Sequence, residues 1–444
     1  MRTEPPALAR RVEPAVLAKP CGCPDYERGI TRRSFITRAL AGGIVAGIAA
    51  EGMFTRLAFA AGPYTGDVFV VLSLRGGFDG LQAIVPANGQ NHLDYLNLRP
   101  TVGIPAASLL PLDATFGMHP AMATLKPFYD AGTFGAVQAV GQDQPDRSHF
   151  SAMEQMERAA PGTSIRTGWI DRVLGLRDPG TAFQGVQMGS NLAGPGFLGP
   201  SPELAMWSVD SFDLNGASDD TQLALWTTAL TGLHTGAPAT LAAPATTALG
   251  ALATAAQLRA AGYTPENGAA YPDTGLGNAM KDVARLIKAD IGLQVAAVDY
   301  GDWDMHSGMG TVAGGWMYDH LTELSGTLAA FATDLGATRL NDVTLVTLTE
   351  FGRRGPENGS GGTDHGFGQA VLLLGGGVKG GQVHMNGGWP GLADADLVDG
   401  DLNGTTDYRW VLAEILEKRC RLGAATDVFP GIDPTRINCV NVKP

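Results

Sequence analysis

The feature that most constrains the fold is an unbroken apolar run, VFVVLSL, at residues 68–74. A strand that is apolar on both faces has to be covered on both faces, which is typical of a buried strand in a parallel sheet. Further strand patterns alternate with helical patterns along the chain. This order predicts an α/β protein with a mostly parallel central sheet and helices on both faces. The remaining predicted strands lie at residues 134–140, within 286–298, at 343–348 and at 370–374, and the clearest predicted helices at 318–335 and 408–418.

The composition indicates one large folded unit. Of the 444 residues, 44% are hydrophobic and only 17% are charged, which excludes an intrinsically disordered chain. An α/β chain of this length commonly forms a single domain around one sheet. We expect residues 61–444 to form that domain, with a helical insertion at about 215–280, where Ala, Thr and Leu predominate.

Residues 1–60 have the pattern of an export signal. Two adjacent arginines, Arg32 and Arg33, precede a short Gly/Ala-rich apolar run and the small-residue motif Ala58-Phe59-Ala60. This order is typical of the twin-arginine signal, which the twin-arginine export machinery recognises on folded proteins. The alternative is a membrane anchor, but the run is shorter than the ~20 apolar residues of a spanning helix. The sequence therefore predicts an exported protein (periplasmic, cell-surface or secreted), although an uncleaved signal would tether it.

The net charge and the cysteines limit which partners, and which state of the cysteines, are expected for this chain. The formal charge is −13, and residues 61–444, with 22 basic and 39 acidic side chains, carry −17. Such an acidic chain is not expected to bind nucleic acid. Beyond the signal, only Cys420 and Cys439 remain. In an exported protein two cysteines suggest one disulfide, and two buried thiols are the alternative.

Metal-binding residue types gather where the predicted strands end. Ligands of parallel α/β sheets bind beyond the carboxyl ends of the strands, so these side chains are expected to converge. A set of oxygen and nitrogen ligands without sulfur suits Zn, Mn, Mg or Ca. The candidate ligands are Asp79, Asp302, Asp304, His306, Glu350, Asp364 and His365.

Each candidate also has a structural alternative. A strand-end aspartate such as Asp79 is commonly a turn or helix cap. Glu350 ends an apolar strand, where its charge needs a cation or hydrogen-bond donors, and an ion pair with Arg353 or Arg354 would meet that need. His149 is expected to have a structural or supporting role rather than to bind a metal directly.

Five motifs make the chain similar to the bacterial domain of unknown function 1501 family. The resemblance covers about residues 30–425 and includes the twin-arginine leader. It implies a fold related to the alkaline phosphatases and sulfatases, with no settled substrate. The motifs are Leu74-Arg-Gly-Gly-Phe-Asp-Gly80, Arg147-Ser-His-Phe150, Trp303-Asp-Met-His306, Thr349-Glu-Phe-Gly-Arg353 and Gly362-Thr-Asp-His365.

Carried over position by position, the resemblance implies roles for individual residues. Asp79 matches the first metal ligand of the wider superfamily, and Ser148, near a helix start, matches the nucleophile. Asp304 and His306 resemble an Asp/His metal pair, although Asp302 has the more usual spacing to His306. The remaining matches are Glu350 at the strand end and His365 in a His-Gly turn, with Phe351 standing where a second metal-binding histidine is expected. One metal site is therefore predicted in preference to two, unless Asp364 substitutes.

Two functions from different classes follow. The first is a metal-dependent hydrolase that attacks a small-molecule or surface-polymer phosphate or related ester through Ser148 or a water, with Arg147 or Arg353 neutralising developing charge. Ser148 lacks the surroundings that sulfatases need, which makes a sulfatase the less favoured branch. The second is a non-catalytic exported binding or assembly protein that retains the fold and at most a structural ion, with an exported protein as a possible partner.

Overall fold

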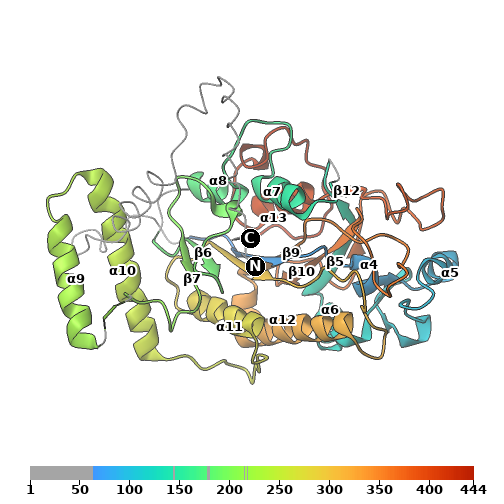
Figure 1. Ribbon diagram of the computed structural model, residues 1–444, viewed down its shortest axis with the longest axis horizontal. Coiled ribbons are helices and arrows are strands. Elements are labelled where there is room, and N and C mark those ends of the chain that lie inside the picture. Colours follow the sequence, from blue (N-terminus) through green and yellow to red (C-terminus); the bar gives the residue numbers. More distant parts are fainter. Residues whose placement is uncertain (1–63, 144–145, 178–180, 215, 218) are drawn as a thin grey trace, which may run out of the picture.

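The computed structural model describes residues 64–143, 146–177, 181–214, 216–217 and 219–444. The predicted twin-arginine signal at residues 1–60 lies outside them. Within this part the fold is α/β, with a mixed and mostly parallel sheet between helical layers (Figure 1). The fold class predicted from the alternating patterns is thereby confirmed, whereas its kinship with alkaline phosphatases stays a prediction.

The central sheet holds nine strands in the order β11-β5-β10-β9-β1-β8-β6-β7, with β12 paired to β5. A smaller sheet has the order β2-β4-β3. The strands are β1 (Val68–Leu74), β2 (Ile84–Pro86), β3 (Leu110–Pro111), β4 (Phe116–Met118), β5 (Phe134–Gly141), β6 (Gly185–Met188), β7 (Leu204–Met206), β8 (Val295–Tyr300), β9 (Val343–Leu348), β10 (Gln369–Gly375), β11 (Val383–His384) and β12 (Thr406–Asp407).

Helices cover both faces of this sheet. They are α4 (Gly80–Ala83), α5 (Gly89–Leu98), α6 (Lys126–Asp130), α7 (His149–Arg158), α8 (Trp169–Gly175), α9 (Asp220–His234), α10 (Ala239–Ala261), α11 (Gly275–Lys288), α12 (Trp316–Leu340) and α13 (Tyr408–Lys418). Short 3-10 helices lie at Ala106–Ser108, Pro120–Leu125, Pro195–Phe197 and Ala425–Asp427.

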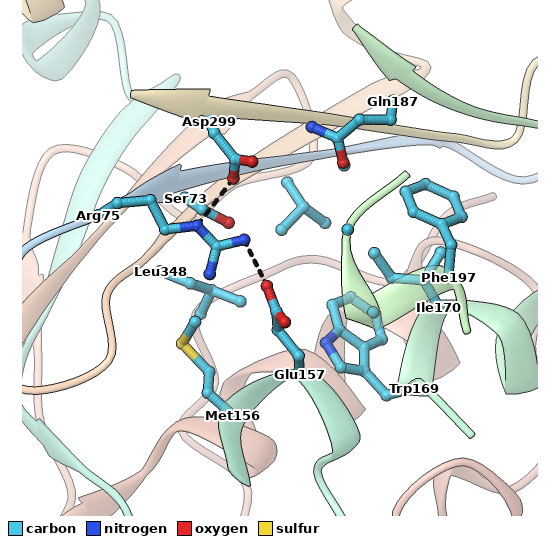
Figure 2. A pocket seen from close by; sticks show the side chains of 14 residues that line it. Ser73, Arg75, Met156, Glu157, Trp169, Ile170, Gln187, Phe197, Asp299 and Leu348 are labelled. Carbon is cyan, nitrogen blue, oxygen red and sulfur yellow. Dashed lines mark hydrogen bonds and ion pairs between the residues drawn. The ribbon is translucent and has the colours of Figure 1, made fainter. Parts of the chain in front are cut away.

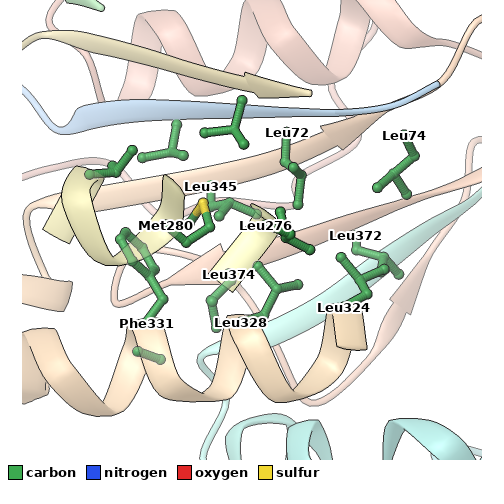
Figure 3. Close-up of a cluster of buried hydrophobic side chains, with 14 of the residues drawn as sticks. Leu72, Leu74, Leu276, Met280, Leu324, Leu328, Phe331, Leu345, Leu372 and Leu374 are labelled. Atoms are coloured by element: carbon green, nitrogen blue, oxygen red, sulfur yellow. The ribbon is translucent and has the colours of Figure 1, made fainter. Parts of the chain in front are cut away.

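Strand β1 shows why a run apolar on both faces was needed. Successive side chains of a strand point to opposite faces, so β1 supplies two cores. Leu72 and Leu74 pack with α11 and α12 side chains such as Met280 (Figure 3). Phe69 and Val71 belong to the opposite core, which α8 and α13 complete. The continuous hydrophobicity of residues 68–74 thus reflects burial between two helical layers.

Strand β10 runs against its neighbours, and this reversal positions the candidate site. It is antiparallel to β9 on one side and to β5 on the other, while the other pairs in the nine-stranded sheet are parallel. A connection between adjacent antiparallel strands leaves and re-enters the sheet at one edge. The loop of residues 349–368 therefore stays at the edge where β1, β5 and β8 end.

The two cysteines differ from the disulfide that the sequence suggests. Cys420 and Cys439 are free, fully buried thiols, so the disulfide suggested by export is wrong here and the alternative of two buried thiols holds. Burial raises the pKa of the Cys420 thiol to about 12, which keeps it protonated and unreactive. The stretch expected to form a helical insertion, about 215–280, contains α9 and α10, which project beyond the β7 edge (Figure 1).

His119 gives the fold a defined acid sensitivity. Its side chain is buried, and its Nδ1 accepts a hydrogen bond from the Ala121 N–H at 3.0 Å, capping the 3-10 helix that begins at Pro120. Burial lowers the pKa of His119 to about 4. Because the unfolded chain takes up this proton at about pH 6.5 and the folded chain only at about pH 4, stability is lost as pH falls between those values.

We therefore expect His119→Asn, which keeps an acceptor but does not titrate, to lose about 2 kcal/mol less stability than the wild type between about pH 7 and pH 4.5. Urea unfolding of both proteins at the two pH values measures this difference. Equal losses in both proteins would show that His119 does not carry the effect.

Candidate metal site

Four connections meet at one edge of the sheet and bring the candidate residues together. The loop after β1 supplies Gly76, the loop after β5 leads into α7 with His149 at its first turn, and the loop after β8 supplies Asp304 and His306. The loop from β9 to β10 supplies His365. Residues far apart in sequence therefore form one cluster, as the strand-end argument predicts.

The Asp304 carboxylate is the centre of this cluster. Its Oδ1 lies 3.0 Å from His306 Nε2, 3.1 Å from His365 Nε2 and 3.4 Å from His149 Nε2. His306 Nε2 and His365 Nε2 are 2.9 Å apart. Ligand atoms of His149, Asp304 and His365 all lie within 4.8 Å of one another, which makes them a possible metal-binding group.

Each of the three histidines presents the same nitrogen to Asp304 because its other nitrogen is engaged. His149 Nδ1 lies 2.7 Å from Glu350 Oε1 and His306 Nδ1 lies 2.9 Å from Asp364 Oδ1. His365 Nδ1 lies 2.8 Å from the Arg147 carbonyl oxygen, which can only accept. Nδ1 is therefore the donor in each ring, and Nε2 keeps its lone pair when the ring is neutral. This arrangement, imidazole held by an acceptor behind it, is the usual support of metal-binding histidines.

The Nε2 atoms of the cluster lie close to one another. His306 Nε2 and His365 Nε2 are 2.9 Å apart, and their lone pairs would repel each other unless a proton or a cation lay between them. His149 Nε2 is buried and has no hydrogen-bond partner, so it too is left for a ligand. A bound cation could satisfy such nitrogens, and His149, Asp304 and His365 are the group whose ligand atoms lie close enough together to hold one.

Arg353 fixes Asp304 and ties the loops to each other. Its fully buried guanidinium donates to Asp304 Oδ1 at 2.7 Å, to the carbonyl oxygens of Gly77 and Thr363, and to that of Gly76. Burial opposes ionisation of Asp304, but the hydrogen bond and positive charge of Arg353 outweigh it and lower its pKa to about 2. Asp304 is therefore an anion at neutral pH, with an oxygen available to a cation.

Packing and exposure leave the cluster open on one side. The buried Phe351 ring stacks against His149 and His365, with centroids 4.8 and 4.7 Å away, and separates them from the core. Gly77, at φ +77°, is required because a Cβ there would lie 2.7 Å from the Phe351 ring. Asp304 is 45% exposed and His306 43% exposed, so the cluster is open to solvent on this side.

Two predicted ligands lie behind the cluster rather than in it. The buried Glu350 accepts from His149 Nδ1 and from the Gly76 N–H, and it forms no ion pair with an arginine of the described residues. Asp364 accepts from His306 Nδ1 and from the Asn358 amide. Both orient histidines, so their contribution is indirect in this arrangement.

Two other predicted ligands lie apart from the cluster. Asp79 is buried, caps α4 through the Gln82 N–H and forms an ion pair with Arg99 Nη1 at 2.9 Å. Asp302 is exposed, adopts φ +64°, and forms no hydrogen bond or ion pair with the cluster in the described part of the chain. The structure thus brings Asp304, His306 and His365 together but places Asp79 in a structural ion pair.

The predicted catalytic residues occupy the rim. Ser148 is exposed at the N-terminus of α7, next to His149, and its hydroxyl is not used to cap that helix. The guanidinium of Arg147 binds Asp399 at 2.9 Å and Asp401 at 2.5 Å. With Arg353 also engaged, both arginines hold protein carboxylates.

His149 is the cluster member that sequence reasoning placed in a supporting role. The motif Arg147-Ser148-His149 draws attention first to its serine. What the sequence does not show is that β5 ends at the same edge as β8 and β9, which brings this ring to Asp304. The helix start at His149 was the available signal.

A separate cavity is lined in part by other charged side chains, which form ion pairs with one another (Figure 2). Arg75 bridges Asp299, at 2.9 Å, and Glu157 across its wall, and Trp169 and Phe197 line its apolar side. None of the clustered histidines lines it. Because Arg75 is held by two carboxylates, this cavity offers no free cation to an anionic substrate.

Fold and site together define a class: an α/β protein with a mixed, mostly parallel sheet and a histidine–aspartate group at one sheet edge. The model of the DUF1501 family, described as a protein of unknown function, matches residues 251–408. This match supports the DUF1501 resemblance and covers Asp304, His306 and His365. No curated protein gives a significant match to the chain.

The ion pair of Asp79 and Arg99 leads to a prediction that separates stability from metal binding. Asp79→Asn leaves the Arg99 charge buried without its partner, so unfolding should cost about 3 kcal/mol less than in the wild type. Metal content should stay unchanged, because Asp79 lies outside the cluster. Denaturant unfolding and elemental analysis measure the two quantities.

The double variant Asp79→Asn/Arg99→Met is the control. It removes both charges and should recover part of the lost stability. Loss of bound metal with unchanged unfolding would instead make Asp79 a ligand.

Proposed function

We propose that the protein is an exported, metal-dependent hydrolase of phosphate or related esters, with one divalent cation held by Asp304, His306, His365 and His149. The observation that carries this proposal is the convergence of three histidine Nε2 atoms on one aspartate oxygen, each ring fixed by an acceptor at Nδ1. Such a set can bind a cation without rearrangement of its supporting hydrogen bonds.

The donor set narrows the range of metals. Three imidazoles and one carboxylate suit Zn²⁺ or Mn²⁺ better than Mg²⁺ or Ca²⁺, which prefer oxygen ligands. A divalent cation at such a site polarises an ester oxygen and lowers the pKa of a nearby water or hydroxyl. One group of ligands among the described residues supports one site.

The chain's own residues suggest how an ester would be attacked. Ser148 is exposed beside His149 and its hydroxyl does not cap the helix, which supports its proposed role as the nucleophile. Arg353 holds the Asp304 carboxylate ionised and in place, and Arg147 supplies the carbonyl that orients His365. We therefore assign both arginines a positioning role instead of direct contact with the transferred group.

The proposal also includes a fold relationship and an export route. An alkaline-phosphatase-like relationship accounts for a strand-end metal site near a serine at a helix start, and export by the twin-arginine route accounts for the leader motif of residues 1–60. The substrate in this proposal is a small-molecule or surface-polymer ester outside the cytoplasm.

Hydrolysis of a panel of phosphomonoesters, phosphodiesters and sulfate esters tests the proposal. Full-length protein loaded with Zn²⁺ or Mn²⁺ should turn over a phosphate ester and lose activity with a chelator. His365→Ala and Ser148→Ala should each lower kcat/KM by at least about a hundredfold, because one removes a ligand and the other the nucleophile.

Ser151→Ala, a serine substitution on the same helix, is the matched control and should retain activity. If Ser148→Ala also retains activity while His365→Ala does not, a water is the nucleophile and the role of Ser148 is wrong. If metal binds but no ester is turned over, the non-catalytic binding or assembly protein is the better account.

A further inference from the structure

The α9–α10 hairpin has a composition unlike the rest of this acidic chain. Between Asp220 and Arg259 the sequence contains no Asp, Glu, Lys or Arg, although charged residues make up 17% of the whole chain. The surface of a soluble domain normally carries interspersed charges. An exposed element without any needs a physical explanation.

Helix α9 carries its large apolar side chains on the outside. Leu225 is 66% exposed, Trp226 52% and Leu233 68%. Trp226 and Leu233 are seven positions apart and lie along one face of the helix, and Leu225 lies at the border of that face. These three residues form an apolar stripe that faces solvent.

The stripe is not needed to hold the hairpin together. The inner side of α9 packs through Leu230 against Ala245 and Leu249 of α10. Helix α10 connects the hairpin to the rest of the domain, and its Ala251 belongs to the main hydrophobic core. In Figure 1, α9 is the outermost element on the β7 side of the molecule. The stripe therefore remains available to something outside the chain.

Helix α10 points to the chemistry of that partner. In the described part of the chain it is the one helix long and apolar enough to cross a membrane, with a mean hydropathy of 1.3 over an 18-residue window. Only 33% of that window is buried, so it is not the core helix of a soluble domain, and it lies far from the N-terminus. Its hydropathy is thus that of an exposed surface.

The length of α9 limits how the hairpin could contact a membrane. The 15 residues of α9 extend about 22 Å, less than the ~30 Å of a bilayer's hydrocarbon core. The hairpin therefore cannot cross as two spanning helices. Contact along the side of α9, within the interfacial region, fits its length and its exposed tryptophan, since tryptophan is favoured at that depth.

We propose that the α9–α10 hairpin binds a lipid surface, with Leu225, Trp226 and Leu233 inserted among the lipid headgroups. Its lack of charge distinguishes a lipid partner from a protein partner, because protein interfaces carry a polar, charged rim that gives specificity. It also lets a chain of net charge −13 approach a bilayer through an uncharged element. The preferred surface is zwitterionic, since anionic lipids repel the body of the protein.

Cosedimentation of the full chain with phosphatidylcholine vesicles tests this proposal. The wild type should bind, and Leu225→Gln/Leu233→Gln should weaken the partition coefficient at least tenfold. Leu93→Gln is the matched control: Leu93 is 54% exposed on α5, at the other end of the molecule in Figure 1, and its substitution should leave binding unchanged. Circular dichroism of each variant reports whether the fold is kept.

Three results would overturn the proposal. The first is a wild-type chain that does not bind vesicles, whatever the variants do. The second is equal binding by the stripe variant and the wild type. The third is a wild-type dimer, measured by light scattering, that the stripe variant converts to a monomer without a change in vesicle binding, which would make a second copy the occupant.

Discussion

The site depends on one anion, the Asp304 carboxylate, and on the buried arginine that holds it. Arg353 donates to Asp304 and to carbonyl oxygens from three separate connections, so a single guanidinium joins the loops after β1, β8 and β9. A buried arginine with nearly all its donors engaged is costly to misplace. The same interaction that keeps Asp304 ionised therefore also fixes the positions from which the histidines approach it.

The sheet makes this convergence possible. Strands β1, β5, β8 and β9 run in one direction and end at one edge, while the reversed β10 returns the long loop of residues 349–368 to that edge. Had β10 been parallel, a crossover would have carried the chain to the opposite edge. Glu350 and His365 would then lie on different sides of the sheet from each other.

Much of the fold could be predicted from the sequence, because burial on both faces leaves a clear pattern. The apolar runs of β1, β5, β9 and β10 and the helix α13 all appeared at their observed places. The short strands β6 and β7 at one side of the sheet did not, since three or four residues are too few for a periodic signal. The reversal of β10 also had no local signature, because direction depends on the connection and not on composition.

For the site, the residue types in the sequence indicate candidate ligands, but the sequence does not show which of them contact one another. Asp304, His306 and His365 stood out by their place after strands, whereas Asp79 has the same sequence context and pairs with Arg99. Asp79 differs from them because its ion-pair partner, Arg99, lies elsewhere in the sequence. His149 joins the cluster for the same reason: its distance from Asp304 is set by the sheet, and its buried, unpartnered Nε2 could not be inferred from the motif around it.

X-ray absorption at the metal edge of the Zn²⁺-loaded protein tests the central claim most directly. If the histidine–aspartate cluster binds the ion, the first shell should contain only nitrogen and oxygen at about 2.0–2.1 Å, with the outer-shell scattering typical of imidazole rings. That imidazole signal should diminish in His306→Ala. A first shell of oxygen alone, or an imidazole signal unchanged by the substitution, would contradict the account.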